Sequence, residues 1–137
     1  MVMALIKGLK YTLGRFFSKP ITIQYPEERR EVAPRWRGIH YFRVDDNGEN
    51  TCVACGLCAA VCPARCIKIK AGEDEDGVRY PIRYEINAIR CIYCGFCVEA
   101  CPVDAIRMSA KYDFTDYRRE DFILTIDRLT SQDYMDK

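Results

Sequence analysis

The chain has 137 residues, a formal net charge of +1 and nine cysteines, and 49% of its residues are hydrophobic. This length and apolar content allow one domain with a modest core, together with flanking segments. The charge is close to neutral, so composition gives no support for binding to nucleic acid, and we expect no nucleic-acid partner.

Residues 2–17 predict an amphipathic helix, because their apolar side chains recur at helical spacing while Lys7 and Lys10 occupy another face. A membrane span is excluded, since each central lysine would cost about 2.5–3.5 kcal/mol in a bilayer. We expect residues 1–19 to bind a membrane surface or a groove of a membrane-bound partner. The alternative is a helix that covers the domain's own core.

Residues 20–44 predict an extended docking arm, because Pro20, Pro26 and Pro34 disfavour helix. Its last part, RWRGIHYFRV, has the composition of a strand that approaches the cysteines further on. His40 is the only histidine, and we interpret it as structural rather than catalytic.

Two cysteine runs of the same design follow, CVACGLCAAVCP from Cys52 and CIYCGFCVEACP from Cys91. Both have the pattern C-x2-C-x2-C-x3-C-P, so that Cys91 in the second run corresponds to Cys52 in the first. This doubled spacing is typical of bacterial proteins that carry two iron–sulfur clusters. It predicts two [4Fe-4S] clusters as cofactors.

The spacing also predicts how the clusters share ligands. Three cysteines in one tight loop cover three corners of a cubane, whereas the fourth cysteine lies roughly 6 Å further along a helical turn. By the exchange of fourth ligands in two-cluster ferredoxins, each fourth cysteine ligates the other cluster. Cluster one is predicted to take Cys52, Cys55, Cys58 and Cys101, and cluster two to take Cys91, Cys94, Cys97 and Cys62.

Other residues of the runs are predicted to support the cluster loops. Gly56 and Gly95 follow each second cysteine, where a left-handed backbone would direct N–H groups at sulfur. The prolines Pro63 and Pro102 follow the fourth cysteines. The ninth cysteine, Cys66, corresponds to alanine in the second repeat, so we interpret it as a small buried thiol and not a ligand.

Two other interpretations of the cysteines are weaker. A disulfide scaffold fits poorly, because no secretory signal precedes the runs and the count is odd. Structural zinc sites are usually built from two separated cysteine pairs, not from three tandem cysteines and a fourth before proline. A zinc-bound interaction module therefore remains a less favoured alternative.

Between and after the runs, the sequence predicts short strands. Residues 66–70 and 78–86 alternate as strands around the acidic turn GEDEDG, and residues 105–108 form the equivalent strand of the second repeat. We therefore predict an α+β fold with a ferredoxin-like core at residues 45–111 and a pseudo-twofold repeat. The tail, residues 112–137, mixes aromatic and charged side chains, and we expect it to wrap over the domain or a partner.

Beyond the cysteines, three segments carry a family resemblance: PRWRGIHYFRVDDNGENTCVACGLCAAVCPARCI, RYPIRYEINAIRCIYCGFCVEACPVDAI and YDFTDYRREDFIL. With the amphipathic start, the chain resembles the ferredoxin-type subunit I of NADH:quinone oxidoreductase, respiratory complex I. The resemblance implies an electron-transfer subunit of this oxidoreductase, with no catalytic residues of its own. Electrons would pass from donor clusters in other peripheral-arm subunits to cluster one, then cluster two, then the terminal cluster beside the quinone.

The expected location is the cytoplasmic face of a prokaryotic cell membrane, with peripheral attachment, because exposed cubanes and thiolates persist best in reducing surroundings. Two related functions stay open. The chain could be the equivalent subunit of a membrane-bound hydrogenase or of a dehydrogenase with another donor. It could also be a freely diffusing two-cluster ferredoxin, which would need neither the helix nor the arm.

Overall fold

The computed structural model describes residues 2–131. Residue 1 and residues 132–137, the end of the predicted tail, lie outside the described residues. The chain divides into two compact units with the boundary between Val32 and Ala33. Each unit is described by itself.

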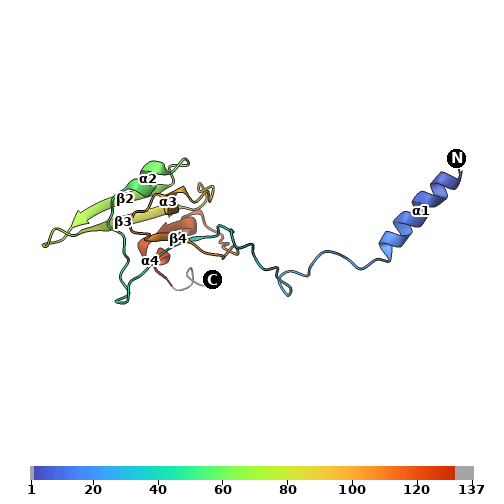
Figure 1. The fold of residues 1–137 in the computed structure, drawn as a ribbon, viewed down its shortest axis with the longest axis horizontal. Helices are drawn as coiled ribbons and strands as arrows, with labels where there is room; N and C mark the ends of the chain where they lie inside the picture. Colours follow the sequence, from blue (N-terminus) through green and yellow to red (C-terminus); the bar gives the residue numbers. More distant parts are fainter. Residues whose placement is uncertain (1, 132–137) are drawn as a thin grey trace. The chain divides into compact units, whose positions relative to one another are not determined.

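The N-terminal unit contains the predicted amphipathic helix, α1 (Val2–Phe16), drawn in blue in Figure 1. None of its side chains is buried, and large apolar residues such as Leu5 and Phe16 are 73% and 80% exposed. Residues 17–32 contain turns but no regular element, as the prolines predict. Within residues 2–131, no helix has the length and hydrophobicity needed to span a bilayer.

The second unit, as far as residue 131, contains five short strands in two antiparallel sheets (Figure 1). One sheet pairs β1 (His40–Phe42) with β4 (Ile106–Met108). The other has the order β2 (Ile67–Glu73), β3 (Arg79–Asn87) and β5 (Ile123–Thr125). The predicted hairpin around the acidic turn is confirmed as β2 and β3, so the alternating pattern identified these two strands correctly.

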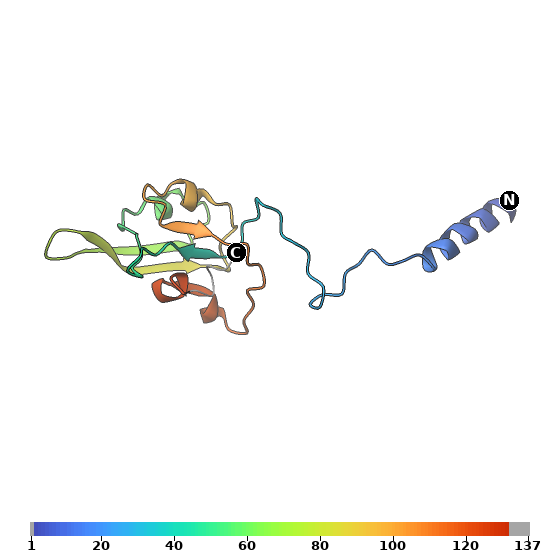
Figure 2. The same ribbon diagram turned by 60° about the horizontal axis from the view of Figure 1, so that its bottom comes forward.

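Short helical segments complete the described part of this unit. Helices α2 (Leu57–Val61) and α3 (Phe96–Glu99) lie on one side of the strands, and α4 (Ile126–Leu129) lies on the other, as Figures 1 and 2 show. A 3-10 turn, η1 (Arg119–Phe122), precedes β5. The α+β prediction is therefore confirmed, with one short helix after each cysteine loop.

The strand register extends the repeat beyond the cysteines. Ile67 in β2 lies opposite Ile86 in β3, and Ile106 in β4 lies opposite Phe42 in β1. Ile67 and Ile106 are separated by the same offset as the first cysteines of the two runs. The partner strands β3 and β1 therefore occupy equivalent positions in the two halves. Nothing in the sequences of β3 and β1 indicates this relation.

Backbone conformation follows the repeat as well. Ala54 and Tyr93 both have positive φ, at 48° and 53°, and so do Arg65 and Asp104, at 47° and 55°. The members of each pair occupy corresponding positions in the two repeats. Left-handed residues other than glycine are uncommon, so their recurrence in pairs means that the two loops share one backbone shape despite different side chains.

The compact unit is wider than the predicted ferredoxin core at residues 45–111. Residues 33–44 supply β1, and residues 112–131 supply β5 and α4. Leu124 in β5 and Leu129 in α4 are both 0% exposed. The physical reason is long-range pairing, because β1 and β5 bury their apolar residues only against strands that are distant in sequence.

We predict that Leu124→Ala lowers the free energy of unfolding by about 2–5 kcal/mol, since it leaves a cavity in the core. The control is Ile82→Ala, at a position in β3 that is 54% exposed, and we expect a change below about 1 kcal/mol there. Urea unfolding followed by circular dichroism measures both values. Equal losses in the two variants would contradict the placement of the tail in the core.

Candidate metal centre

The first cavity is lined by Cys52, Cys55, Cys58 and Cys101. Three of these cysteines belong to the first run and the fourth belongs to the second run. The rest of the wall is mainly apolar and consists of Phe42, Val53, Gly56, Ile69, Tyr84, Val103, Ala105 and Ile106.

The second cavity is the counterpart of the first. It is lined by Cys91, Cys94 and Cys97 of the second run and Cys62 of the first. Its wall is completed by His40, Pro63, Ala64, Cys66, Ile67, Ile92 and Gly95. The structure thus gathers each predicted set of four thiols around its own cavity. Of the predicted loop supports, Pro102 lines neither cavity.

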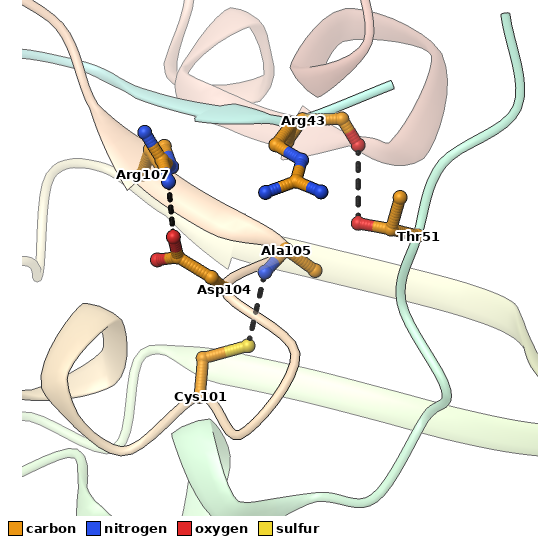
Figure 3. Close-up of polar contacts among 6 residues, drawn as sticks. All are labelled: Arg43, Thr51, Cys101, Asp104, Ala105 and Arg107. Atoms are coloured by element: carbon orange, nitrogen blue, oxygen red, sulfur yellow. Dashed lines mark hydrogen bonds and ion pairs between the residues drawn. The ribbon is translucent and has the colours of Figure 1, made fainter. Parts of the chain in front are cut away.

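Backbone N–H groups are directed at the thiol sulfurs. The N–H of Ala105 donates to Sγ of Cys101 at 3.2 Å, as Figure 3 shows. The backbone of Cys66 makes the equivalent hydrogen bond to Cys62. In the second loop the N–H of Tyr93 donates to Sγ of Cys91 at 3.3 Å. Such bonds stabilise negative charge on sulfur and tune any bound cluster.

The chain after Cys101 is fixed by polar contacts, and Figure 3 draws two of them, between Asp104 and Arg107 and between Thr51 and Arg43. Asp104 and Arg107 form an ion pair, and the backbone N–H of Arg43 donates to the carbonyl oxygen of Ala105 at 2.8 Å. The Thr51 hydroxyl donates to the carbonyl oxygen of Arg43 at 3.4 Å. These bonds join the segment before Cys52 to the segment after Cys101, and both cysteines line the first cavity.

The predicted loop glycines have the backbone conformation that their positions require. Gly56 has φ 79° and Gly95 has φ 84°, and each directly precedes the short helix after its loop. A left-handed backbone here turns the chain sharply after the second cysteine of each run. This turn allows the second and third cysteines of a run to line the same cavity.

Burial disfavours thiolates in these cavities. Cys58 and Cys97 are 8% and 7% exposed. Desolvation raises the pKa of Cys52, Cys58 and Cys91, and it raises the pKa of Cys97 to about 12. Deprotonated ligands in such sites need the positive charge of bound metal, so metal binding releases protons.

Cys66 is a fifth thiol beside the second cavity. It is 5% exposed, and its Sγ lies 3.4 Å from Sγ of Cys62. Desolvation raises the pKa of Cys66. Desolvation alone would also raise the pKa of Cys62, but hydrogen bonds from the backbone and thiol of Cys66 lower it. These shifts favour Cys62 as the thiolate and Cys66 as its hydrogen-bond donor.

Two residues near the thiols are not marked by the cysteine pattern. The buried Tyr84 hydroxyl donates to Sγ of Cys58 at 3.3 Å. His40 is 1% exposed, and burial lowers its pKa to about 4. Neither residue lies in a cysteine run, and only the strand register brings each to its cavity.

The donor sets fit cubane clusters. Each cavity offers four thiols of the cysteine runs, an apolar wall and N–H donors at sulfur, which is how [4Fe-4S] clusters are held. All nine cysteines are described and free of disulfides. Over residues 2–131, no three His, Cys, Asp or Glu side chains converge as ligands of a single metal ion.

Comparisons with known proteins agree with this chemistry. Residues 51–105 match the family of 4Fe-4S dicluster domains. NADH-quinone oxidoreductase subunit I 2 of Geobacter metallireducens is 50% identical over 129 residues, covering 94% of this chain and 98% of that protein. The chain belongs to the subunit I family of NADH-quinone oxidoreductases. Subunit I 1 of Geobacter sulfurreducens is 52% identical, covering 94% and 97% of the two chains. Subunit I 2 of Rhizobium meliloti is 46% identical, with coverage of 93% and 69%.

One solved structure has a similar fold. The match is to a chain of the membrane-bound sulfane sulfur reductase, an archaeal respiratory membrane complex, with TM-score 0.55 and 34% identity. It covers 81% of this chain and 56% of that chain. The predicted ferredoxin-type fold, the two [4Fe-4S] clusters and the role as an electron-transfer subunit of an oxidoreductase are thus confirmed.

We predict that Gly95→Ala destabilises the holo domain more than Gly56→Ala. Left-handed alanine costs about 1–2 kcal/mol at both positions, and a Cβ at Gly95 would also lie 3.0 Å from Nε of Arg37. Loss of visible cluster absorbance during denaturant titration measures the order. Gly8→Ala in α1, where a Cβ would meet nothing within 4 Å, serves as control and should change nothing in the domain.

Proposed function

We propose that the chain relays electrons inside NADH-quinone oxidoreductase. It would receive them from cluster-bearing subunits of the peripheral arm and pass them towards the terminal cluster beside the quinone site. The observation that carries the proposal is the pair of cavities, each lined by four thiols drawn from both cysteine runs. When bound, a [4Fe-4S] cluster takes up and gives back one electron.

The proposed ligand sets follow the two cavities. The first cavity offers Cys52, Cys55, Cys58 and Cys101 for cluster one, and the second offers Cys91, Cys94, Cys97 and Cys62 for cluster two. The backbone hydrogen bonds that residues 64–66 direct at Cys62 support its choice over Cys66. As supports of the cluster loops we propose Gly56, Gly95, Pro63 and Pro102. Pro102 lines neither cavity, and it would act by starting the segment that follows Cys101.

The rest of the chain would hold and shield these sites. Apolar side chains such as Phe42, Ile69 and Ile106 line the first cavity and exclude water from it. Water exclusion protects cubanes from solvent and oxygen, and buried N–H donors adjust their potentials. One-electron transfer needs no general acid or base, which agrees with the chain's lack of a predicted catalytic residue.

We further propose that α1 attaches the chain to the membrane surface, or to a membrane-bound partner subunit, on the cytoplasmic face. Its apolar residues, among them Leu5 and Leu9, are exposed, and Lys7, Lys10 and Arg15 add positive charge. An amphipathic helix with basic residues lies in the interfacial plane of anionic membranes.

A second candidate function is supported by the structural match to the sulfane sulfur reductase complex. Related respiratory membrane complexes could use an equivalent ferredoxin-type subunit with a different electron donor. Identification of the subunits that co-purify with the native chain separates the two functions. An NADH-oxidising flavin subunit in the complex supports the first candidate, and its replacement by another catalytic subunit supports the second.

Single cysteine substitutions test the ligand sets. We expect Cys62→Ser to remove cluster two and spare cluster one, because Cys62 supplies the fourth thiol of the second cavity. Cys101→Ser should remove cluster one and spare cluster two, because Cys101 supplies the fourth thiol of the first cavity. Low-temperature EPR of the anaerobically reduced chain, with iron and sulfide analysis, measures both clusters. Cys66→Ser is the matched control and should retain two clusters. Loss of cluster two in Cys66→Ser would overturn the assignment, and bound zinc without sulfide would overturn the proposed function.

A pair of substitutions in α1 tests attachment. Leu9→Glu places a charge in the apolar face, whereas Tyr11→Glu places the same charge on the opposite face. We expect Leu9→Glu to reduce retention of the full chain on native membranes at least several-fold, and Tyr11→Glu to have a smaller effect. Binding to anionic vesicles without partner subunits would indicate the lipid surface. Equal retention of both variants would contradict attachment through this face.

A further inference from the structure

His40 carries a buried polar atom that nothing in the described chain satisfies. The side chain is 1% exposed, and its Nδ1 has no hydrogen-bond partner among residues 2–131. Ser109, the other buried polar residue of the core, is fully engaged, since its hydroxyl donates to the Ile39 carbonyl and accepts from the Lys111 N–H. Buried polar atoms are nearly always paired, so the unpaired nitrogen indicates a missing acceptor or donor.

The position of His40 points to that partner. His40 lines the second cavity together with the thiols of Cys62, Cys91, Cys94 and Cys97. Its ring centroid lies 5.6 Å from that of Tyr93, which stands between two of these cysteines in the loop. The imidazole is therefore held against the loop that forms the cavity.

The repeat gives His40 an equivalent residue at the first cavity. His40 in β1 lies opposite Met108 in β4, and Tyr84 in β3 lies opposite Ile69 in β2. Ile69 and Met108 are separated by the same offset as the first cysteines of the two runs. His40 and Tyr84 therefore occupy equivalent positions in the two halves.

Tyr84 already makes the bond that this equivalence suggests for His40. Its hydroxyl donates to Sγ of Cys58 at 3.3 Å in a buried setting beside the first cavity. The counterpart of Cys58 in the second run is Cys97, which lines the cavity of His40. An imidazole carries at least one N–H in either protonation state, so His40 can donate to sulfur as the phenol does.

We propose that His40 donates an N–H hydrogen bond to a sulfur of cluster two, as Tyr84 donates to a sulfur ligand of cluster one. The proposal rests on the proposed ligand sets. A hydrogen bond to sulfur is stronger when the cluster carries more negative charge, so it stabilises the reduced form and raises the reduction potential. Each half of the fold then has, at an equivalent strand position, a side-chain donor that adjusts its own cluster.

Substitutions in the assembled complex test this assignment. His40→Leu removes the donor, and we expect the reduction potential of cluster two to fall while that of cluster one stays unchanged. Tyr84→Phe is the matched variant and should lower only the potential of cluster one. His40→Gln restores an N–H donor and should recover part of the shift. EPR-monitored redox titration measures both potentials. An unchanged potential of cluster two in His40→Leu, with both clusters present, would overturn the proposal.

A second measurement needs no substitution at His40. Because His40 is the only histidine, 15N-histidine labels this site alone in a full chain purified without a histidine tag. We expect pulsed EPR of the reduced holo chain to detect 15N coupling that persists in Cys101→Ser and is lost in Cys62→Ser. Two intact clusters without 15N coupling would overturn the role of His40 and leave the proposed function standing. Absence of [4Fe-4S] clusters from the native chain would overturn both.

Discussion

The lining of each cavity by a fourth cysteine from the other loop is the constraint on which the rest of the domain depends. Cys62 follows the first loop but lines the second cavity, and Cys101 follows the second loop but lines the first. Neither loop can complete a four-thiol site alone. The two halves must therefore fold together, and the strands that hold α2 beside α3 serve this pairing of the two sites.

The two cavities share a design but differ in their side chains. Both have left-handed turns at matching positions and N–H groups directed at their thiols. One has Tyr84 at its wall, while the other has His40 and a fifth thiol, Cys66. Because hydrogen bonds and polarity around sulfur set reduction potentials, these differences allow two clusters in one small domain to have different potentials.

The segments outside the cysteine runs have separate physical roles. Residues 33–44 and 112–131 complete the sheets and the core, with Leu124 and Leu129 fully buried. By contrast, α1 has no buried side chain and keeps its apolar face exposed. This exposed apolar face is the observation behind the attachment that we propose for α1.

Local patterns in the sequence were sufficient to predict the cofactors and the β2–β3 hairpin, and they also led to the four-thiol sets and loop glycines that we propose. Cysteine spacing and strand alternation depend on neighbours in the chain, so they can be recognised without a fold. The addition of β5 to the core by the tail, the pairing of β1 with β4, and the approach of Tyr84 and His40 to the two cavities emerged from the three-dimensional arrangement alone. Such contacts join residues far apart in sequence, and their register depends on the packing of side chains from both halves, which no local pattern records.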